Sequence, residues 1–189
     1  NAVVVAFFAF GFATSATYIF NDILDIENDQ FHPIKSKRPL ASGLLSPMIA
    51  SIAAIMSASI ALYIASYLNS LFFIALLGYL LLQVIYSLGL KNIPTIVILI
   101  IATGFIIRVY SGAFVIDAHL SVWFLLCVIS VALFLAAGKR RSELGVVENF
   151  TQTRKSLMKY DRELLNSYVT MFGNAAWLSW ALFTFFESP

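Results

Sequence analysis

The feature that most constrains this chain is a series of six uninterrupted apolar runs, each long enough to cross about 30 Å of hydrocarbon. Strands of a membrane β-barrel would alternate in polarity over about ten residues, whereas these runs are continuous and about twice as long. Helices satisfy every backbone polar group within one segment, so they are the consistent way to place such runs in lipid. We therefore predict an all-α fold, a polytopic helical membrane bundle. Its six transmembrane helices are expected at about residues 1–20, 44–67, 70–88, 94–116, 120–137 and 166–186.

Composition supports a membrane protein, since 60% of the residues are hydrophobic and only 12% are charged. Soluble domains of this length carry about twice that share of charge. A net charge of +2 gives no reason to expect nucleic-acid binding. The single cysteine, Cys127, lies in an apolar run and is expected to be a packing residue. The chain begins inside one apolar run and ends just after another, so residues 1–189 are expected to be one membrane domain truncated at both ends.

The basic residues are distributed unevenly among the connecting segments. Eleven of the 12 Lys and Arg residues follow the first, third and fifth apolar runs, whereas the turns at 68–70 and 117–119 contain none. By the positive-inside rule, the basic connections face the cytoplasm. We therefore predict an integral protein of a bacterial or archaeal cell membrane that meets ionic substrates on its cytoplasmic side.

Arg108 is the one basic residue within an apolar run. A charge at such a position costs about 2.5–3.5 kcal/mol even on lenient insertion scales, so it needs a partner. One interpretation is a phosphate or carboxylate group in a polar cavity of the bundle. The other is a structural pair with a buried acid or with backbone carbonyls.

The segment 21–43, which reads NDILDIENDQFHPIKSKRPLASG, follows the first apolar run. Successive residues of a helix are separated by about 100°, which places one amide and three carboxylates on the same face. Crowded carboxylates repel one another unless a cation lies between them. Oxygen ligands suit Mg²⁺, which commonly shares its remaining positions with substrate phosphates. The predicted Mg²⁺ ligands are Asn21, Asp22, Asp25 and Asp29, with Asp22 and Asp25 as the catalytic pair; the alternative is a solvated acidic helix end.

Basic residues follow these acids within ten positions, as a diphosphate site requires. Lys35 and Arg38 are the predicted ligands of the diphosphate oxygens; anchoring of topology or contact with anionic headgroups is the alternative. His32, beside a proline, is expected to form local hydrogen bonds and receives no other role.

The pattern Asn-Asp-x-x-Asp-x-x-x-Asp followed by Arg-Pro-Leu-x-x-Gly resembles the first aspartate-rich motif of the UbiA superfamily of intramembrane prenyltransferases. The resemblance extends over essentially the whole chain. It implies one UbiA-like membrane domain, of a bundle of about nine helices, of which the first and about two at the end are missing here. The motif is carried by Asn21, Asp22, Asp25, Asp29, Arg38, Pro39, Leu40 and Gly43.

The segment 138–165 departs from that superfamily because most members carry a second aspartate-rich motif there, and here Asp161 is the only aspartate. The strings Gly-Lys-Arg-x-x-Glu-Leu from Gly138 and Arg-Lys-Ser-Leu from Arg154 instead resemble the decaprenyl-phosphate phosphoribosyltransferase branch. This resemblance implies Mg²⁺-dependent transfer of 5-phosphoribose from phosphoribosyl diphosphate to a polyprenyl phosphate such as decaprenyl phosphate, a step in cell-wall arabinan precursor synthesis. Candidate ligands for the 5-phosphate and the acceptor phosphate are Lys91, Arg108, Lys139 and Arg140, with Tyr86 and Glu143 as further candidates. For residues 139–141 the alternative is a topology anchor with Glu143 as its surface partner.

Two other functions predict different sequence features. An aromatic prenyltransferase of the same fold, moving a prenyl group from prenyl diphosphate, would carry the second aspartate cluster. A transporter would show two related halves with broken helices, and residues 1–90 and 91–189 show no such repeat.

Overall fold

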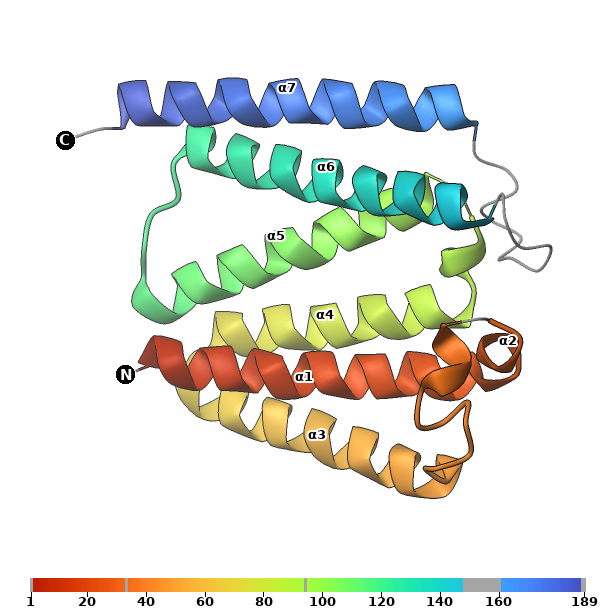
Figure 1. Cartoon of the computed structure of the whole chain (residues 1–189). Helices are drawn as coiled ribbons and strands as arrows, with labels where there is room; N and C mark the ends of the chain where they lie inside the picture. The colour runs from red at the N-terminus through yellow and green to blue at the C-terminus, as the bar shows by residue number, and fades with distance from the viewer. Residues whose placement is uncertain (1, 33, 94, 148–160, 188–189) are drawn as a thin grey trace. The chain divides into compact units, whose positions relative to one another are not determined.

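The computed structural model describes residues 2–32, 34–93, 95–147 and 161–187, which contain helices and no strand. Six of the helices are long and apolar enough to cross a membrane (Figure 1). The predicted class and number of membrane segments are therefore confirmed. These helices are α1 Ala2–Leu24, α3 Pro47–Leu68, α4 Ser70–Leu88, α5 Ile96–Ile116, α6 Val122–Val147 and α7 Arg162–Phe186.

The chain falls into two compact units. Unit 1 comprises Asn1–Gly89 and Tyr110–Asp117, and therefore α1, α3, α4 and the last part of α5. Unit 2 comprises Leu90–Val109 and Ala118–Pro189, and therefore the first part of α5 together with α6 and α7. The short helices α2 Ile26–Gln30 and η1 Lys35–Lys37 belong to unit 1, and η2 Leu90–Asn92 belongs to unit 2.

In unit 1, α1 lies against both α3 and α4 (Figure 1). The buried residues of α1 and α3 are mainly alanines, which recur at helical spacing and let two backbones approach closely. On α4 the buried residues are larger, and the Phe10 ring lies 6.0 Å from that of Phe72 and 5.2 Å from that of Tyr79. The alanines are Ala6, Ala9, Ala13 and Ala16 on α1, and Ala50, Ala54, Ala61 and Ala65 on α3.

Local signals explain where the helices of unit 1 begin. Ser46 caps α3 by accepting from the Ile49 N–H at 3.3 Å, and Pro47 follows as the first helical residue. Asn69 caps α4 by accepting from the Leu71 N–H at 2.7 Å. Its amide also donates to the Phe114 carbonyl at 3.1 Å, which ties the α3–α4 turn to the end of α5.

Unit 2 is built on the long contact between α6 and α7. Its core contains Ile98 from α5, Ala136 and Ala137 from α6, and Leu165 from α7. Asp161 caps α7 by accepting from the Glu163 N–H at 3.1 Å. The basic string around Arg154 lies outside the described residues.

The helix bounds differ most from the expected ones around the connection 138–165. Helix α6 continues to Val147 rather than ending at residue 137, and α7 begins at Arg162 rather than residue 166. The reason is local, because the Lys, Arg and Glu residues after Gly138 are good helix formers. Lys139, Arg140 and Glu143 therefore lie on the last turns of a helix and not in a loop.

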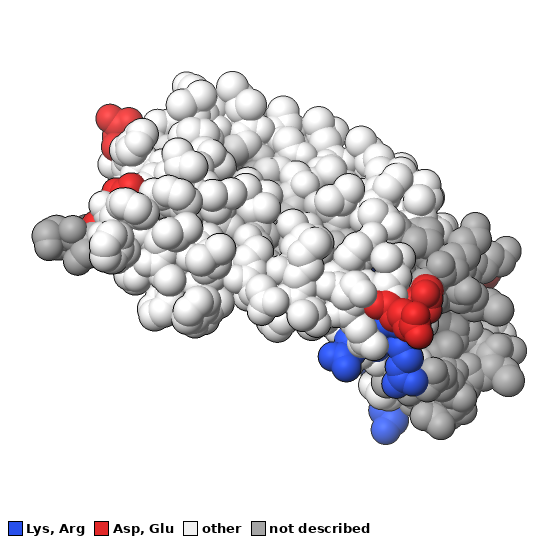
Figure 2. Space-filling model, turned by 90° about the horizontal axis from the view of Figure 1, so that it is seen from above, with Lys and Arg blue, Asp and Glu red and all other residues white. Residues whose placement is uncertain are grey.

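Charged side chains avoid the middle of the surface seen in Figure 2, which views the molecule from the α7 side. Blue and red atoms lie only toward the two ends, and all the visible blue atoms are at one end. The uncharged stretch between them is what a hydrocarbon layer requires.

Candidate metal and phosphate site

The four predicted metal ligands Asn21, Asp22, Asp25 and Asp29, called here the aspartate face, lie where α1 ends and α2 begins. Asp25 sits at the break between these helices, with φ −101° and ψ 6°. The backbone bonds from the Asp25 N–H to the Asn21 carbonyl (3.0 Å) and from the Asp29 N–H to the Asp25 carbonyl (2.8 Å) keep helical spacing across it. The one-face arrangement expected from helical periodicity therefore survives the interruption.

After α2 the chain turns back toward the acids. The His32 ring nitrogen Nδ1 accepts from the Ile34 and Lys35 N–H groups, both at 3.2 Å, so the expected local hydrogen bonding of His32 is confirmed. Helix η1 follows, and the Arg38 N–H donates to the Lys35 carbonyl at 2.9 Å. Gly43 closes the next turn at φ +77°, a left-handed conformation that favours glycine.

Arg38 is the centre of the resulting cluster. Its Nη1 donates to Asp22 Oδ1 at 2.7 Å and to Asp29 Oδ2 at 2.8 Å. Lys35 adds a longer ion pair, with 3.9 Å between its Nζ and Asp29 Oδ1. The Asp29 side chain is only 6% exposed, and these two cations offset the cost of burying its charge.

Asn21 and Asp25 form a second pair beside this cluster. The Asn21 amide nitrogen donates to Asp25 Oδ2 at 3.1 Å, which directs the amide oxygen elsewhere. That oxygen, Asn21 Oδ1, is buried and accepts no hydrogen bond from the described part of the chain. A buried acceptor without a donor is costly, and a cation would satisfy it.

The donor set fits Mg²⁺, although the side chains need to rearrange to bind it. Three carboxylates and an orphaned amide oxygen are the hard ligands that Mg²⁺ prefers. Among residues 2–32, 34–93, 95–147 and 161–187, however, no three His, Cys, Asp or Glu side chains are close enough to hold a metal as they stand. Oxygens of Asp22 and Asp29 instead converge on one nitrogen of Arg38. A metal that binds these same two oxygens would therefore need the point that the guanidinium occupies.

The second group of predicted phosphate ligands lies on α6 in unit 2. Arg140 is 2% exposed and its Nη1 donates to Glu143. The Nε of Arg140 is buried and donates to none of the described residues. Lys139 is exposed on the neighbouring position of the helix. Arg140 is thus held in place by Glu143, and one of its donors is left for another acceptor.

The remaining candidates lie on α5, η2 and α4. Arg108 lies on α5 with its guanidinium 5.7 Å from the centre of the Phe105 ring, a cation–π contact. Lys91 lies in η2, in unit 2, and Tyr86 is half-buried on α4, in unit 1. Their assignment to phosphate groups stays a prediction.

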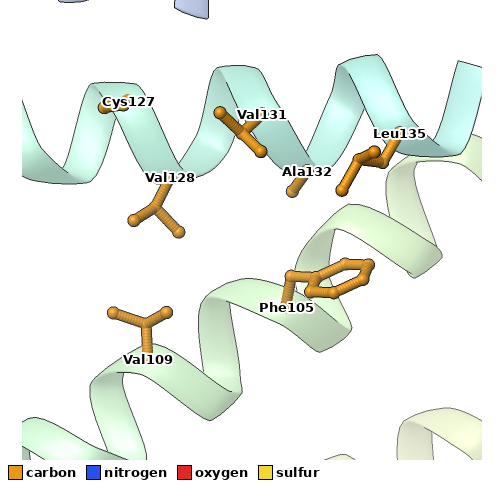
Figure 3. A pocket seen from close by; sticks show the side chains of 7 residues that line it. All are labelled: Phe105, Val109, Cys127, Val128, Val131, Ala132 and Leu135. Carbon is orange, nitrogen blue, oxygen red and sulfur yellow. The ribbon is translucent and has the colours of Figure 1, made fainter. Parts of the chain in front are cut away.

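A small apolar cavity of about 190 Å³ opens between α5 and α6 within unit 2 (Figure 3). Phe105 and Val109 face it from α5, and Cys127 is among the residues that face it from α6. The Cys127 thiol also approaches the Ala176 carbonyl at 4.0 Å, in keeping with a packing role. None of the predicted metal or phosphate ligands lines this cavity.

One contact of Arg38 was not anticipated from the sequence, whereas Glu143 had been considered as a partner of the basic residues 139–141. The bridge from Arg38 to Asp22 and Asp29 joins residues 16 and 9 positions apart and depends on the fold-back through η1. The pair between Arg140 and Glu143 has a local signal, since residues three apart on a helix are neighbours.

Comparison with known proteins agrees with these observations. A decaprenyl-phosphate phosphoribosyltransferase of Mycolicibacterium smegmatis is 36% identical over 184 residues, which cover 97% of this chain and 58% of that protein. One from Mycobacterium tuberculosis is 34% identical over 186 residues, covering 98% and 62%. The chain therefore spans about 60% of the length of these relatives.

Solved structures show the same fold. A UbiA homolog from Archaeoglobus fulgidus bound to DMAPP and Mg²⁺ matches with a TM-score of 0.83 at 19% identity, covering 96% of this chain and 65% of that one. The same homolog bound to GPP and Mg²⁺ matches equally well, with the same coverage. Residues 1–139 match the UbiA prenyltransferase family. This match covers most of the chain, including the whole aspartate face, and the chain belongs to the UbiA prenyltransferase family.

Proposed function

We propose that the protein transfers 5-phosphoribose from phosphoribosyl diphosphate to a polyprenyl phosphate in a Mg²⁺-dependent reaction at the cytoplasmic face of the membrane. The observation that carries the proposal is the convergence of Asp22, Asp29, Lys35 and Arg38 beside a membrane helix. Oxygen ligands for a metal and cations for phosphate oxygens lie together there, as a diphosphate site needs. The choice of donor follows the names of the mycobacterial relatives.

In this reaction an acceptor phosphate oxygen attacks the anomeric carbon of the ribose, and the bond from that carbon to diphosphate breaks. Asn21, Asp22, Asp25 and Asp29 would hold Mg²⁺, which neutralises charge on the leaving diphosphate. Lys35 and Arg38 donate hydrogen bonds to the oxygens of the leaving diphosphate. The electrons of the broken bond to the anomeric carbon therefore move onto a group that lies among cations. The acceptor is already anionic near neutral pH, so its attack requires no general base.

The cations of unit 2 have separate roles in the proposal. Phosphoribosyl diphosphate carries a 5-phosphate in addition to the diphosphate, and the acceptor brings a further phosphate. Lys91, Arg108, Lys139 and Arg140 are assigned to these two groups. Among them Arg140 has the clearest support, because it is buried and has an Nε donor that bonds to no described residue.

The alternative is prenyl transfer from a prenyl diphosphate to an aromatic or other acceptor. It is favoured by the A. fulgidus homolog, whose structures contain DMAPP or GPP with Mg²⁺. Both reactions break a bond to diphosphate, so the aspartate face serves either one.

The test is a membrane assay of the full-length protein with two substrate pairs. One pair is phosphoribosyl diphosphate with polyprenyl phosphate, and the other is prenyl diphosphate with an aromatic acid. We expect product only from the first pair, and loss of that product when EDTA removes divalent metal. Turnover of the second pair alone would overturn the proposal in favour of prenyl transfer.

A further inference from the structure

The position of Arg38 poses a problem for metal binding at the aspartate face. One atom, Nη1, lies 2.7 Å from an oxygen of Asp22 and 2.8 Å from an oxygen of Asp29. A Mg²⁺ ion bound by these two oxygens needs to approach each of them to about 2.0–2.1 Å. The guanidinium and the metal therefore compete for the same oxygens and the same space.

The carboxylates of this face are more buried than Arg38, although Asp22, with a side chain that is 29% exposed, is only slightly so. The Asp29 side chain is 6% exposed, and Asp25 is 4% exposed and bonded to Asn21. The Arg38 side chain is 38% exposed. The Arg38 backbone, which directly follows η1, is extended, with φ −64° and ψ 145°. Displacement of the arginine is therefore the change that leaves the carboxylates in place.

We propose that Arg38 is an exchangeable internal cation of the aspartate face. It pairs with Asp22 and Asp29 until a divalent metal ion takes their oxygens, and the displaced guanidinium then becomes available to the diphosphate. The inference rests on the proposed function only in placing the metal at these carboxylates. It is independent of which group is transferred.

This role has a physical reason. Three carboxylates on one face repel one another, and a cation tethered to the same chain holds them together before the metal binds. The released guanidinium is planar and suited to bidentate phosphate contacts. Metal binding and preparation of the diphosphate site would thus be one coupled event.

The competing arrangement is a permanent clamp. In that case Arg38 stays on Asp22 and Asp29, and the metal uses only Asp25 and the Asn21 amide oxygen. Removal of the arginine should raise metal affinity if Arg38 is exchangeable and leave it nearly unchanged if Arg38 is a clamp, and neither prediction involves a substrate.

The first experiment measures Mn²⁺ binding to the full-length protein in detergent by electron paramagnetic resonance, with no substrate present. We expect Arg38→Gln to bind Mn²⁺ about 3- to 10-fold more tightly than the unaltered protein, the size set by partly exposed ion pairs. Lys37→Gln is the matched control, because Lys37 is an exposed cation in the same segment, with no ion pair to a described residue. It removes the same charge and should change affinity less than about twofold.

A second measurement uses the unaltered protein, so it does not depend on how well the variant folds. Phenylglyoxal modifies free guanidinium groups, and mass spectrometry reports the rate at each arginine. Mg²⁺ alone should accelerate modification of Arg38 but not of Arg141, which is exposed. Equal Mn²⁺ affinity in Arg38→Gln and Lys37→Gln, or an Arg38 rate indifferent to Mg²⁺, would establish the clamp and overturn the proposal.

These outcomes are distinguishable from failure of the proposed function. If the protein uses prenyl diphosphate instead of phosphoribosyl diphosphate, both metal measurements keep their expected results. If Arg38 is a clamp, phosphoribosyl transfer can still be observed while both metal measurements fail.

Discussion

Asp25 shows how one residue joins the membrane helix to the site. It lies 4% exposed at the break between α1 and α2, and its carboxylate is held by the Asn21 amide. Burial of a carboxylate is costly, and a break in a helix is costly too. These costs are consistent with a metal-binding role for Asp25 rather than with a solvated helix end. Asp22 and Asp29 on either side already share Arg38.

At this scale we expect Asp25→Asn to lower the rate of the metal-dependent reaction on the order of 100-fold or more, because a ligand charge is lost where the leaving group develops its own. The measurement is kcat with saturating Mg²⁺ and the preferred substrate pair. Glu27→Gln is the matched control, since Glu27 is an exposed acid on the other face of the same short helix. Unchanged kcat in Asp25→Asn would remove this carboxylate from the mechanism.

At the scale of elements, α1 is positioned by small residues. Its buried residues are mostly alanines, as are those of α3, against which it packs, while Phe10 packs against the larger residues of α4. Association of helices in lipid depends on close van der Waals packing, since lipid is as apolar as the side chains. The aspartate face begins at the end of α1, so the depth and rotation of this helix set where the acids emerge.

We therefore expect Ala13→Leu, at a position that is 0% exposed, to destabilise the protein by about 1–3 kcal/mol through overpacking. The midpoint of thermal unfolding in detergent measures the effect. Ser15→Leu adds similar bulk at an exposed position of the same helix and should leave the midpoint nearly unchanged. Equal midpoints for the two variants would show that α1 and α3 are not closely packed at Ala13.

At the scale of the whole molecule, the positions of the basic residues predict the orientation in the membrane. Eleven of the 12 Lys and Arg residues lie within residues 35–38, at Lys91 or within residues 139–162, and the turns at 68–70 and 117–119 contain none. The expected cytoplasmic side is therefore the one that carries η1, η2 and the end of α6. The proposed donor is a soluble sugar diphosphate, so this orientation determines which compartment supplies it.

Orientation can be measured with single cysteines in a Cys127→Ser background. Arg141→Cys lies at the end of α6, and His119→Cys lies in the turn before it; both positions are exposed. A membrane-impermeant maleimide should label Arg141→Cys only from the cytoplasmic side and His119→Cys only from the opposite side. Labelling of both from one side would contradict the six-span topology.

Much of this architecture was predictable from local patterns. Continuous apolar runs predict six spanning helices because lipid offers the backbone no hydrogen-bond partners. Helical periodicity puts Asn21, Asp22, Asp25 and Asp29 on one face, and the backbone bonds around Asp25 keep that spacing in the structure. The helix limits differed from the expected ones, most of all at the end of α6, since charged residues after Gly138 continue a helix as readily as they form a loop.

The partners of these residues were decided by tertiary structure. Arg38 meets Asp22 and Asp29 because η1 and the preceding turn at His32 bring the chain back, and no periodic pattern encodes a contact across such a turn. The sequence by itself determined that acids and bases share one end of a membrane helix. The fold decided that Arg38 pairs with Asp22 and Asp29, because a buried negative charge is costly unless a cation lies beside it.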